Sequence, residues 1–348
     1  TDLEVNLRGV TTTTGGTVSH LANSIENVIG GSGSDIMNLH RDISGVIELY
    51  NGLLTWDGVA ITHSGIEIVD VRLVDDEGER VGVVRILEDQ DYSGLDLRLE
   101  ARSIDIRASI KAAGLSLRSD SILGIDQDFS ALSGLGRVTM LEVGKLRIEA
   151  AGGVGDVDVP LYVKADVIEA LTQGAASIYL VQLGDAVIGD VEFSVAGEDA
   201  IGADTTGLST GAGGDIHLVN LFGTLTVNEA IQATGGRVIL TTESIDINAE
   251  ISSRYEAGGQ LFRGSLILQP LSVATRIDMA TAVPTDALSF YLSGDAINQF
   301  MSGFNESQPS SYLLNGELVT VDSNNGITIG RADGRHVITL EAFIYTES

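Results

Sequence analysis

One short segment of the sequence has the residue types and spacing of a cation-binding loop. Residues 30–38 read Gly-Gly-Ser-Gly-Ser-Asp-Ile-Met-Asn and fit the pattern G-G-x-G-x-D-x-U-x, in which U is a large apolar residue. Calcium takes about six to eight oxygen ligands, and tight glycine turns present carbonyl oxygens beside the aspartate. The segment therefore predicts a calcium site at Gly31, Gly33 and Asp35. One copy supplies half of such a site, and the alternative is a glycine turn with Asp35 as a turn residue.

Other carboxylates are grouped along the chain. Asp126 with Asp128, and Asp246 with Arg237, have the residue types used by polysaccharide lyases and hydrolases built on a β-helix. Their spacing does not require that arrangement, because a chain with 49 acidic residues contains such pairs by chance. A carbohydrate-active site is one interpretation, and solvated loops or outward strand faces are the other. The acidic groups lie at residues 75–79, 88–91, 126–128 and 156–158.

Composition excludes several classes of function. Lys+Arg is 20 and Asp+Glu is 49, so the formal net charge of −29 disfavours nucleic acids and anionic membrane surfaces as partners. No segment approaches the ~20 apolar residues of a membrane-spanning helix, so we expect no membrane insertion. The absence of cysteine excludes disulfides, thiol nucleophiles and Cys-ligated metals. No two of the five histidines lie within five residues of each other, so no His-x₃-His metal pattern exists.

The sequence repeats with a short period. Double glycines begin successive segments at Gly213, Gly235 and Gly258, so that the two intervals are nearly equal. Apolar and polar residues alternate after each, which indicates β-strands. The pattern S-I-D-I-x-A-x-I occurs at 103–110 and again at 244–251. We therefore predict an all-β fold, a right-handed parallel β-helix (β-solenoid) with layers of about 20–23 residues. An antiparallel sandwich with regularly spaced turns is the alternative.

Three zones follow from this pattern. Residues 1–82 are an irregular Gly- and Thr-rich β region that contains the calcium-like turn, and residues 83–282 form the β-helix core. Residues 283–348 form a C-terminal module. There, a polar cap before 296–301 and a glycine after it predict a short helix near the C-terminus, followed by final strands.

Parts of the sequence resemble two kinds of bacterial exoprotein. Residues 264–271 look like a strand entering a connector of giant filamentous-haemagglutinin-like exoproteins. Residues 287–292 and 326–334 are similar to the short-helix and I-x-I-G-x-x-x-G pattern of their repeats. Residues 30–35, with the Ile-Glu-Asn lead-in at 25–27, resemble repeats-in-toxin adhesins.

The resemblance implies a large secreted surface protein with tandem β-helical segments that serve adhesion or fibre building, and it supplies no catalytic residues. We therefore expect an extracellular or cell-surface structural module, not an enzyme, that forms a stiff acidic rod and binds Ca2+. Its expected partners are identical or neighbouring modules joined end to end, and cell-surface glycans, because exposed sheet edges pair with other chains. A carbohydrate-active β-helix enzyme and a passive tandem spacer are the alternatives.

Overall fold

The structure is a computed structural model of the chain, in which two compact units are described separately. Unit 1 is Thr1–Ala165 with Phe193–Glu198, and unit 2 is Asp166–Glu192 with Asp199–Ser348. The backbone is described for every strand and helix bounded below. Side chains are described for residues 46–49, 69–75, 77–121, 140–193, 207–254, 264–279, 289–300 and 327–336. The division at 1–82, 83–282 and 283–348 remains a prediction.

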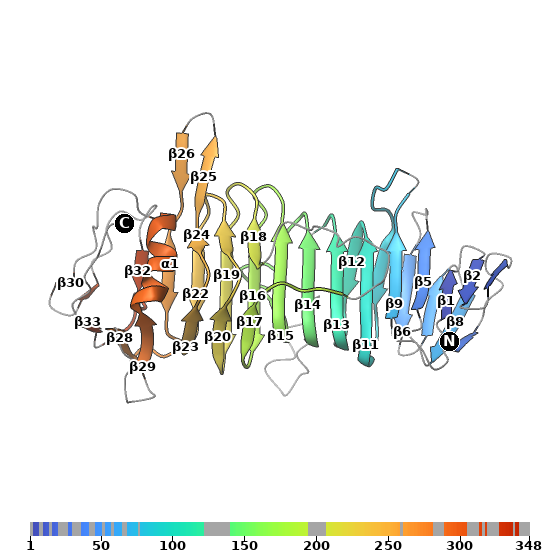
Figure 1. Cartoon of the computed structure of the whole chain (residues 1–348), viewed down its shortest axis with the longest axis horizontal. Helices are drawn as coiled ribbons and strands as arrows, with labels where there is room; N and C mark the ends of the chain where they lie inside the picture. The colour runs from blue at the N-terminus through green and yellow to red at the C-terminus, as the bar shows by residue number, and fades with distance from the viewer. Residues whose placement is uncertain are drawn as a thin grey trace. The chain divides into compact units, whose positions relative to one another are not determined.

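Both units consist mainly of short β-strands, and most of the strand pairs are parallel (Figure 1). The expected all-β class is confirmed. The long parallel sheets favour the parallel arrangement over an antiparallel sandwich. Within the described residues, no helix is both long and apolar enough to cross a membrane.

Unit 1 contains two parallel ladders of strands. The first comprises β5 (Ile36–Arg41), β9 (Ile68–Leu73), β11 (Gln90–Ala101), β13 (Ile110–Ser119) and β14 (Leu141–Ala150). The second comprises β6 (Val46–Tyr50), β10 (Val83–Ile86) and β12 (Ser103–Ile106). Where the side chains of these strands are described, residues that face the core largely alternate with residues that face outward, as the two-residue period requires. Leu97, Leu115 and Leu146 form one fully buried column.

Shorter strands complete unit 1. β1 (Leu3–Asn6) is parallel to β5 and antiparallel to β2 (Val10–Thr13), which is antiparallel to β3 (Gly16–Ser19). β7 (Leu53–Trp56) is antiparallel to β6 and to β8 (Val59–Ser64), and β8 is parallel to β4 (Asn27–Ile29). β15 (Leu161–Thr172) begins in unit 1 and ends in unit 2.

Unit 2 contains three parallel ladders, named here A, B and C. Ladder A comprises β16 (Ile178–Leu183), β19 (Ile216–Leu221), β22 (Val238–Thr241), β27 (Leu266–Gln269) and β32 (Ile327–Ile329). Ladder B comprises β17 (Ala186–Ile188), β20 (Thr224–Val227) and β23 (Ser244–Ile247). Ladder C comprises β18 (Leu208–Thr210), β21 (Ile231–Ala233) and β24 (Ile251–Ser252). From β16 to β24, the chain passes through A, B and C in that order three times.

The layer length in unit 2 agrees with the expected repeat only over part of the chain. Leu208 pairs in register with Ile231 in ladder C, and Ile216 pairs with Val238 in ladder A. Both separations fall within the expected layer length. The preceding step in ladder A, from Ile178 to Ile216, is much longer. Extra residues between strands therefore lengthen some layers without changing the pairing.

One expected repeat boundary is wrong. The double-glycine pattern places the third boundary at Gly258, whereas the structure pairs Leu266 with Val238 and stacks Gly264 on Gly236. The difference arises because β25 (Arg254–Ala257) and β26 (Gln260–Arg263) form an antiparallel hairpin between β24 and β27. Residues 258–259 lie outside the described residues.

Stacked glycines form the corner between ladder C and ladder A. A Cβ atom on Gly236 would overlap the carbonyl oxygen of Gly214, and a Cβ atom on Gly264 would overlap the carbonyl oxygen of Gly236. Glycine is required at these positions because the backbones of successive layers approach so closely. Hydroxyl groups satisfy the corner carbonyls: Thr210 Oγ1 donates to Gly214 O at 2.8 Å, and Ser253 Oγ donates to Gly236 O.

The C-terminal part of unit 2 contains the one helix among the described residues. α1 (Gly294–Phe304) follows β29 (Ser289–Ser293), and Ser293 Oγ accepts a hydrogen bond from Ala296 N at 3.0 Å as the N-cap. The expected short helix is confirmed. α1 packs against β24 of ladder C. The remaining pairs are β28 (Arg276–Ala280), parallel to β29 and to β33 (Ile338–Leu340), and β30 (Leu313–Leu314), antiparallel to β31 (Glu317–Leu318).

Candidate functional site

Two of the sequence-based site predictions fall outside the described residues. These are the calcium turn at Gly31, Gly33 and Asp35, and the acidic pair Asp126 and Asp128. Both remain predictions. Where the structure describes side chains, no three or more His, Asp or Glu residues are grouped so that they would hold one metal ion.

Some of the acidic residues that the structure describes stabilise their own turns. Asp75 Oδ1 accepts hydrogen bonds from the backbone N–H groups of Glu77 at 3.1 Å and Glu79 at 2.8 Å. Asp91 Oδ1 accepts from Ser93 N at 3.0 Å and from Ser93 Oγ at 2.5 Å, and these hydrogen bonds lower the pKa of Asp91. Short local bonds of this kind are typical of aspartate in turns. They give these carboxylates a structural role.

Other carboxylates connect one strand layer to the next. In each case, a side-chain oxygen accepts a hydrogen bond from a backbone N–H group of an adjacent layer. The pairs are Asp89 with Ser109 N at 3.0 Å, Asp185 with Thr224 N at 2.7 Å, Asp215 with Arg237 N at 2.7 Å and Glu243 with Ser272 N at 2.8 Å. Hydrogen bonds to an ionised acceptor are stronger than neutral ones. These carboxylates therefore satisfy amides at the ends of strands and hold neighbouring layers together.

The structure does not bring Asp246 and Arg237 together as a carbohydrate-active pair. Arg237 Nη2 and Nε lie 2.6 Å and 3.1 Å from Asp215 Oδ2, in the preceding layer. Asp246 Oδ2 accepts a hydrogen bond from Asn248 Nδ2 at 3.3 Å, two residues further along the chain. Arg237 pairs with Asp215 because the layer that contains Asp215 lies next to it. The spacing of residues in the sequence did not indicate this neighbour.

One further motif matches a catalytic pattern in sequence but not in structure. Residues 207–211 read Gly-Leu-Ser-Thr-Gly, which fits the G-x-S-x-G pattern of serine hydrolases. That pattern works on a sharp turn between a strand and a helix. Here, Ser209 lies inside β18, where it pairs in register with Leu171 of β15 and Gln232 of β21, and the next element is strand β19. Ser209 therefore does not have the geometry of that nucleophile.

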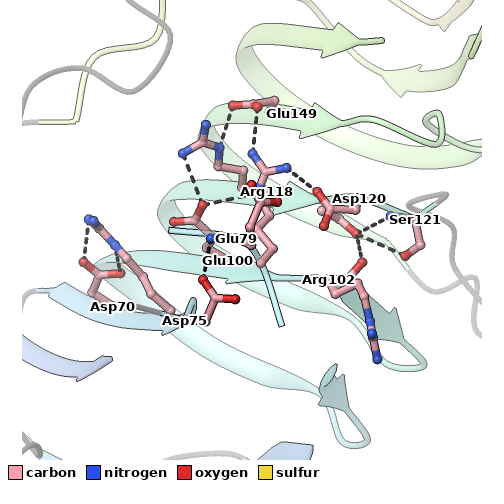
Figure 2. A network of polar contacts seen from close by, with 12 residues as sticks. Asp70, Asp75, Glu79, Glu100, Arg102, Arg118, Asp120, Ser121 and Glu149 are labelled. Carbon is pink, nitrogen blue, oxygen red and sulfur yellow. Dashed lines mark hydrogen bonds and ion pairs between the residues drawn. The ribbon is translucent and has the colours of Figure 1, made fainter. Parts of the chain in front are cut away.

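A network of charged side chains lies on the outer face of the first ladder of unit 1 (Figure 2). Arg72 of β9, Glu100 of β11, Arg118 of β13 and Glu149 of β14 occupy equivalent register positions on successive strands. Adjacent strands are about 4.8 Å apart, and the charges alternate in sign along the column. Arg72 donates from Nε to Asp70 Oδ1 of its own strand at 3.0 Å. Arg118 Nη1 lies 3.1 Å from Glu100 Oε1, and Arg118 Nε lies 2.7 Å from Glu149 Oε2.

Arg80 joins this network from the loop that follows β9. Its side chain is only 11% exposed, and its guanidinium lies 3.2 Å from Glu100, 2.5 Å from Asp120 and 2.8 Å from Glu149. Burial alone would lower the pKa of Arg80, but the hydrogen bonds and charges of Asp120 and Glu149 outweigh burial and raise it. Arg80 therefore stays charged and connects carboxylates from β11, the end of β13 and β14. Carboxylates engaged in this way are poorly placed to exchange protons with a substrate.

Charges of alternating sign recur in two more columns of unit 1. One column is formed by Glu48, Arg85 and Asp105, on β6, β10 and β12. The other places Glu142 Oε atoms 3.5 Å from Lys111 Nζ and 3.0 Å from Lys164 Nζ. The hydrogen bond from Lys164 lowers the pKa of Glu142. If a strand paired with the next strand but one in its ladder, like charges would lie opposite each other. These columns therefore favour the observed order of strands.

The sequence predictions missed this network, although a signal for it is present. Four segments read apolar-x-apolar followed by a charged residue: 69–72, 97–100, 115–118 and 146–149. Their last residues are Arg, Glu, Arg and Glu in that order. Alignment of these segments by their apolar pairs would have predicted an alternating column.

The side chain of His217 gives unit 2 an expected pH dependence. It lies on β19 with its ring edge-to-face to Tyr179, and the ring centroids are 6.0 Å apart. Burial lowers the pKa of His217, Arg237 lowers it further, and Asp215 acts in the opposite direction. An unfolded histidine has a pKa of about 6.5, so the unfolded chain binds a proton first as the pH falls. The stability from neutral His217 is therefore complete above that pH and is lost progressively below it.

Urea unfolding of the wild type and of the His217→Gln variant measures this effect. Between pH about 8 and about 5, the unfolding free energy of the wild type is expected to fall more steeply than that of the variant. The other histidines contribute equally to both proteins, so the difference between the two curves isolates His217. Parallel curves would show that this residue carries no such linkage.

Comparison with known proteins gives no family for a chain with these ladders, charged columns and glycine corners. No protein-family model, no curated protein and no solved structure matches the chain.

Proposed function

We propose that the chain is a structural or adhesive module of a large secreted bacterial surface protein, and that it has no catalytic activity. The observation that carries this proposal is that outward carboxylates bind the side chains and amides of adjacent strand layers. The contacts of Glu100 and Glu149 with Arg118 and Arg80 are the clearest case. Carboxylates used in this way stabilise a stack of strands. A glycoside hydrolase instead needs a carboxyl pair on either side of a bound sugar.

We propose further that the parallel ladders are the faces of a right-handed β-helix. The repeated order of ladders A, B and C, with each strand bonded to its equivalent one pass later, supports this arrangement. Crossovers between parallel strands are right-handed almost without exception. A coil of this kind pairs its backbone groups with the layers above and below, so it would resist bending and local opening.

The ends of such a rod are where identical or neighbouring modules would join. An end strand presents backbone N–H and C=O groups that another strand can pair with. Ladder A reaches as far as β32, close to the C-terminal end of the described residues. Contacts between the two different ends of identical rods do not close on themselves, so they would extend into extracellular fibres. Calcium at Gly31, Gly33 and Asp35, and glycans on the cell surface, are the further ligands of this proposal.

Electron microscopy of the purified chain, with calcium and then with EDTA, tests this function. We expect fibres in calcium and their loss in EDTA, and we expect the Asp35→Asn variant to behave in calcium as the wild type does in EDTA. Single particles in both conditions would contradict fibre assembly and leave the tandem spacer. Release of reducing ends from a panel of polysaccharides would contradict the absence of catalysis and favour the carbohydrate-active alternative.

A further inference from the structure

The β25–β26 hairpin is an insertion in an otherwise short corner of unit 2. The connection from ladder C to ladder A takes residues 211–215 after β18 and residues 234–237 after β21. After β24, the same connection extends as far as residue 265, and β25 and β26 occupy most of it. Figure 1 shows the two strands extending beyond their neighbours in unit 2. The layer would close without them, as the two earlier layers do.

The base of the hairpin is held in the regular stack. Ser253 Oγ donates to Gly236 O and accepts a hydrogen bond from Gly264 N at 2.9 Å. Gly264 N also donates to Ser253 O at 3.2 Å. Ser253 and Gly264 therefore close the layer on Gly236 directly beneath the hairpin. The stacking of β27 on β22 is complete without any contribution from the inserted strands.

Within the described part of the chain, β25 and β26 pair only with each other. A lone two-stranded hairpin is marginally stable in water, and a further surface is usually needed to stabilise it. An insertion that adds nothing to the ladders and is marginal alone is better explained by a contact outside the unit.

The residues of the hairpin are those typical of contact surfaces. The register pairs Arg254 with Arg263 at its base and Tyr255 with Phe262 in the next position. Aromatic residues make up only 5% of the chain, and basic residues are outnumbered 20 to 49 by acidic ones. Arginine, tyrosine and phenylalanine are enriched in the centres of protein interfaces, and arginine and tyrosine are also enriched among their energetic hot spots. The pairing concentrates these residue types in two adjacent register positions.

We propose that the β25–β26 hairpin is a docking arm that binds the acidic surface of a second copy of this chain. Charge complementarity selects this partner: the arm carries two arginines in register against one carboxylate, Glu256, and the rest of the chain carries all the other acidic residues. The contact is lateral and does not depend on end-to-end stacking. It would position neighbouring modules side by side even where their ends do not meet.

Sedimentation velocity in EDTA, where end-to-end fibres are not expected, tests the arm over a concentration series, with thermal unfolding as a control for folding. The first variant replaces residues 254–263 by Thr-Gly, which copies Thr234–Gly235 and restores the short corner between Ser253 and Gly264. The second variant combines Arg254→Glu and Arg263→Glu, and its matched control combines Arg254→Lys and Arg263→Lys. We expect the wild type and the lysine variant to self-associate, and the short-corner and glutamate variants to remain monomeric with unchanged unfolding.

Several outcomes would overturn the proposal. A wild type that remains monomeric throughout the series would exclude a second copy as the partner. If that monomer bound heparin, the partner of the arm would be an anionic glycan instead. Association of the short-corner variant at wild-type strength would show that the arm is not the contact. Undiminished association of the glutamate variant would exclude an acidic partner surface. Fibres in the microscope with the short-corner variant would leave the end-to-end proposal intact, so the two proposals fail separately.

Discussion

Replacing Gly236 by alanine is expected to lower the unfolding free energy by about 3 kcal/mol, at the upper end of the usual cost of overpacking. The added Cβ would overlap the carbonyl oxygen of Gly214 in the layer below. That carbonyl accepts the hydrogen bond from Thr210 Oγ1 at 2.8 Å, so it cannot rotate away without breaking this bond. Gly264 stacks on Gly236 from the other side, so a shift of the backbone would disturb two interlayer contacts.

The matched control for this substitution is Gly213→Ala, in the same corner one layer earlier. Gly213 has a φ of 89°, and a Cβ there would have only Ala175 Cβ near it, at 3.8 Å. Its replacement therefore costs only the strain of a left-handed backbone, about 1 kcal/mol. Urea unfolding followed by far-UV circular dichroism measures both changes. Equal losses from the two variants would show that close stacking of backbones is not what requires glycine at 236.

The stacking of residues 207–252 was predictable because its successive layers are nearly equal in length. The alternating apolar residues and the glycine pairs at 213 and 235 then repeat with the same period. The structure pairs Ile216 with Val238, which have the same separation in sequence as the two glycine pairs. The same reasoning failed at the next layer, where Gly258 imitates a corner glycine although Gly264 occupies the corner. A hairpin inserted at a corner changes the spacing in sequence and leaves the stacking unchanged. Periodicity alone cannot distinguish the two glycines.

The alternating column has a signal in the sequence, but the partners of Arg80 were not predictable from spacing along the chain. The carboxylate partners of Arg80 are 20, 40 and 69 residues away in sequence, at Glu100, Asp120 and Glu149. Layers in unit 1 differ in length, since Leu97 pairs with Leu115 and Leu115 pairs with Leu146. Side chains become neighbours through the register of the strands. The identity of an ion pair therefore follows only once the length of each layer is known.

Replacing Arg80 by methionine is expected to lower the unfolding free energy by about 2 kcal/mol, somewhat less than the usual cost of breaking a buried ion pair. Methionine keeps the apolar stem but leaves Glu100 and Glu149, whose side chains are 11% and 14% exposed, with less positive charge nearby. Loss of one partner of a fully buried pair costs about 3–5 kcal/mol. The expected value is smaller because Arg118 still contacts both glutamates, and because the side chain of Asp120 is 40% exposed.

The control is Arg85→Met, on a second charged column of the same unit. Arg85 is 40% exposed and lies 3.9 Å from both Glu48 and Asp105, so its loss is expected to cost less than about 0.5 kcal/mol. Arg80→Lys is expected to fall between the two, because lysine keeps the charge but cannot reach three carboxylates with a planar fork. Urea unfolding in low and high salt measures all three variants, and the loss at Arg80 should survive salt better than that at Arg85 because its partners are less exposed. Equal small losses at both arginines would mean that the outward carboxylates do not hold the layers together. They would then be available for a ligand, and the observation on which the structural function rests would no longer support it.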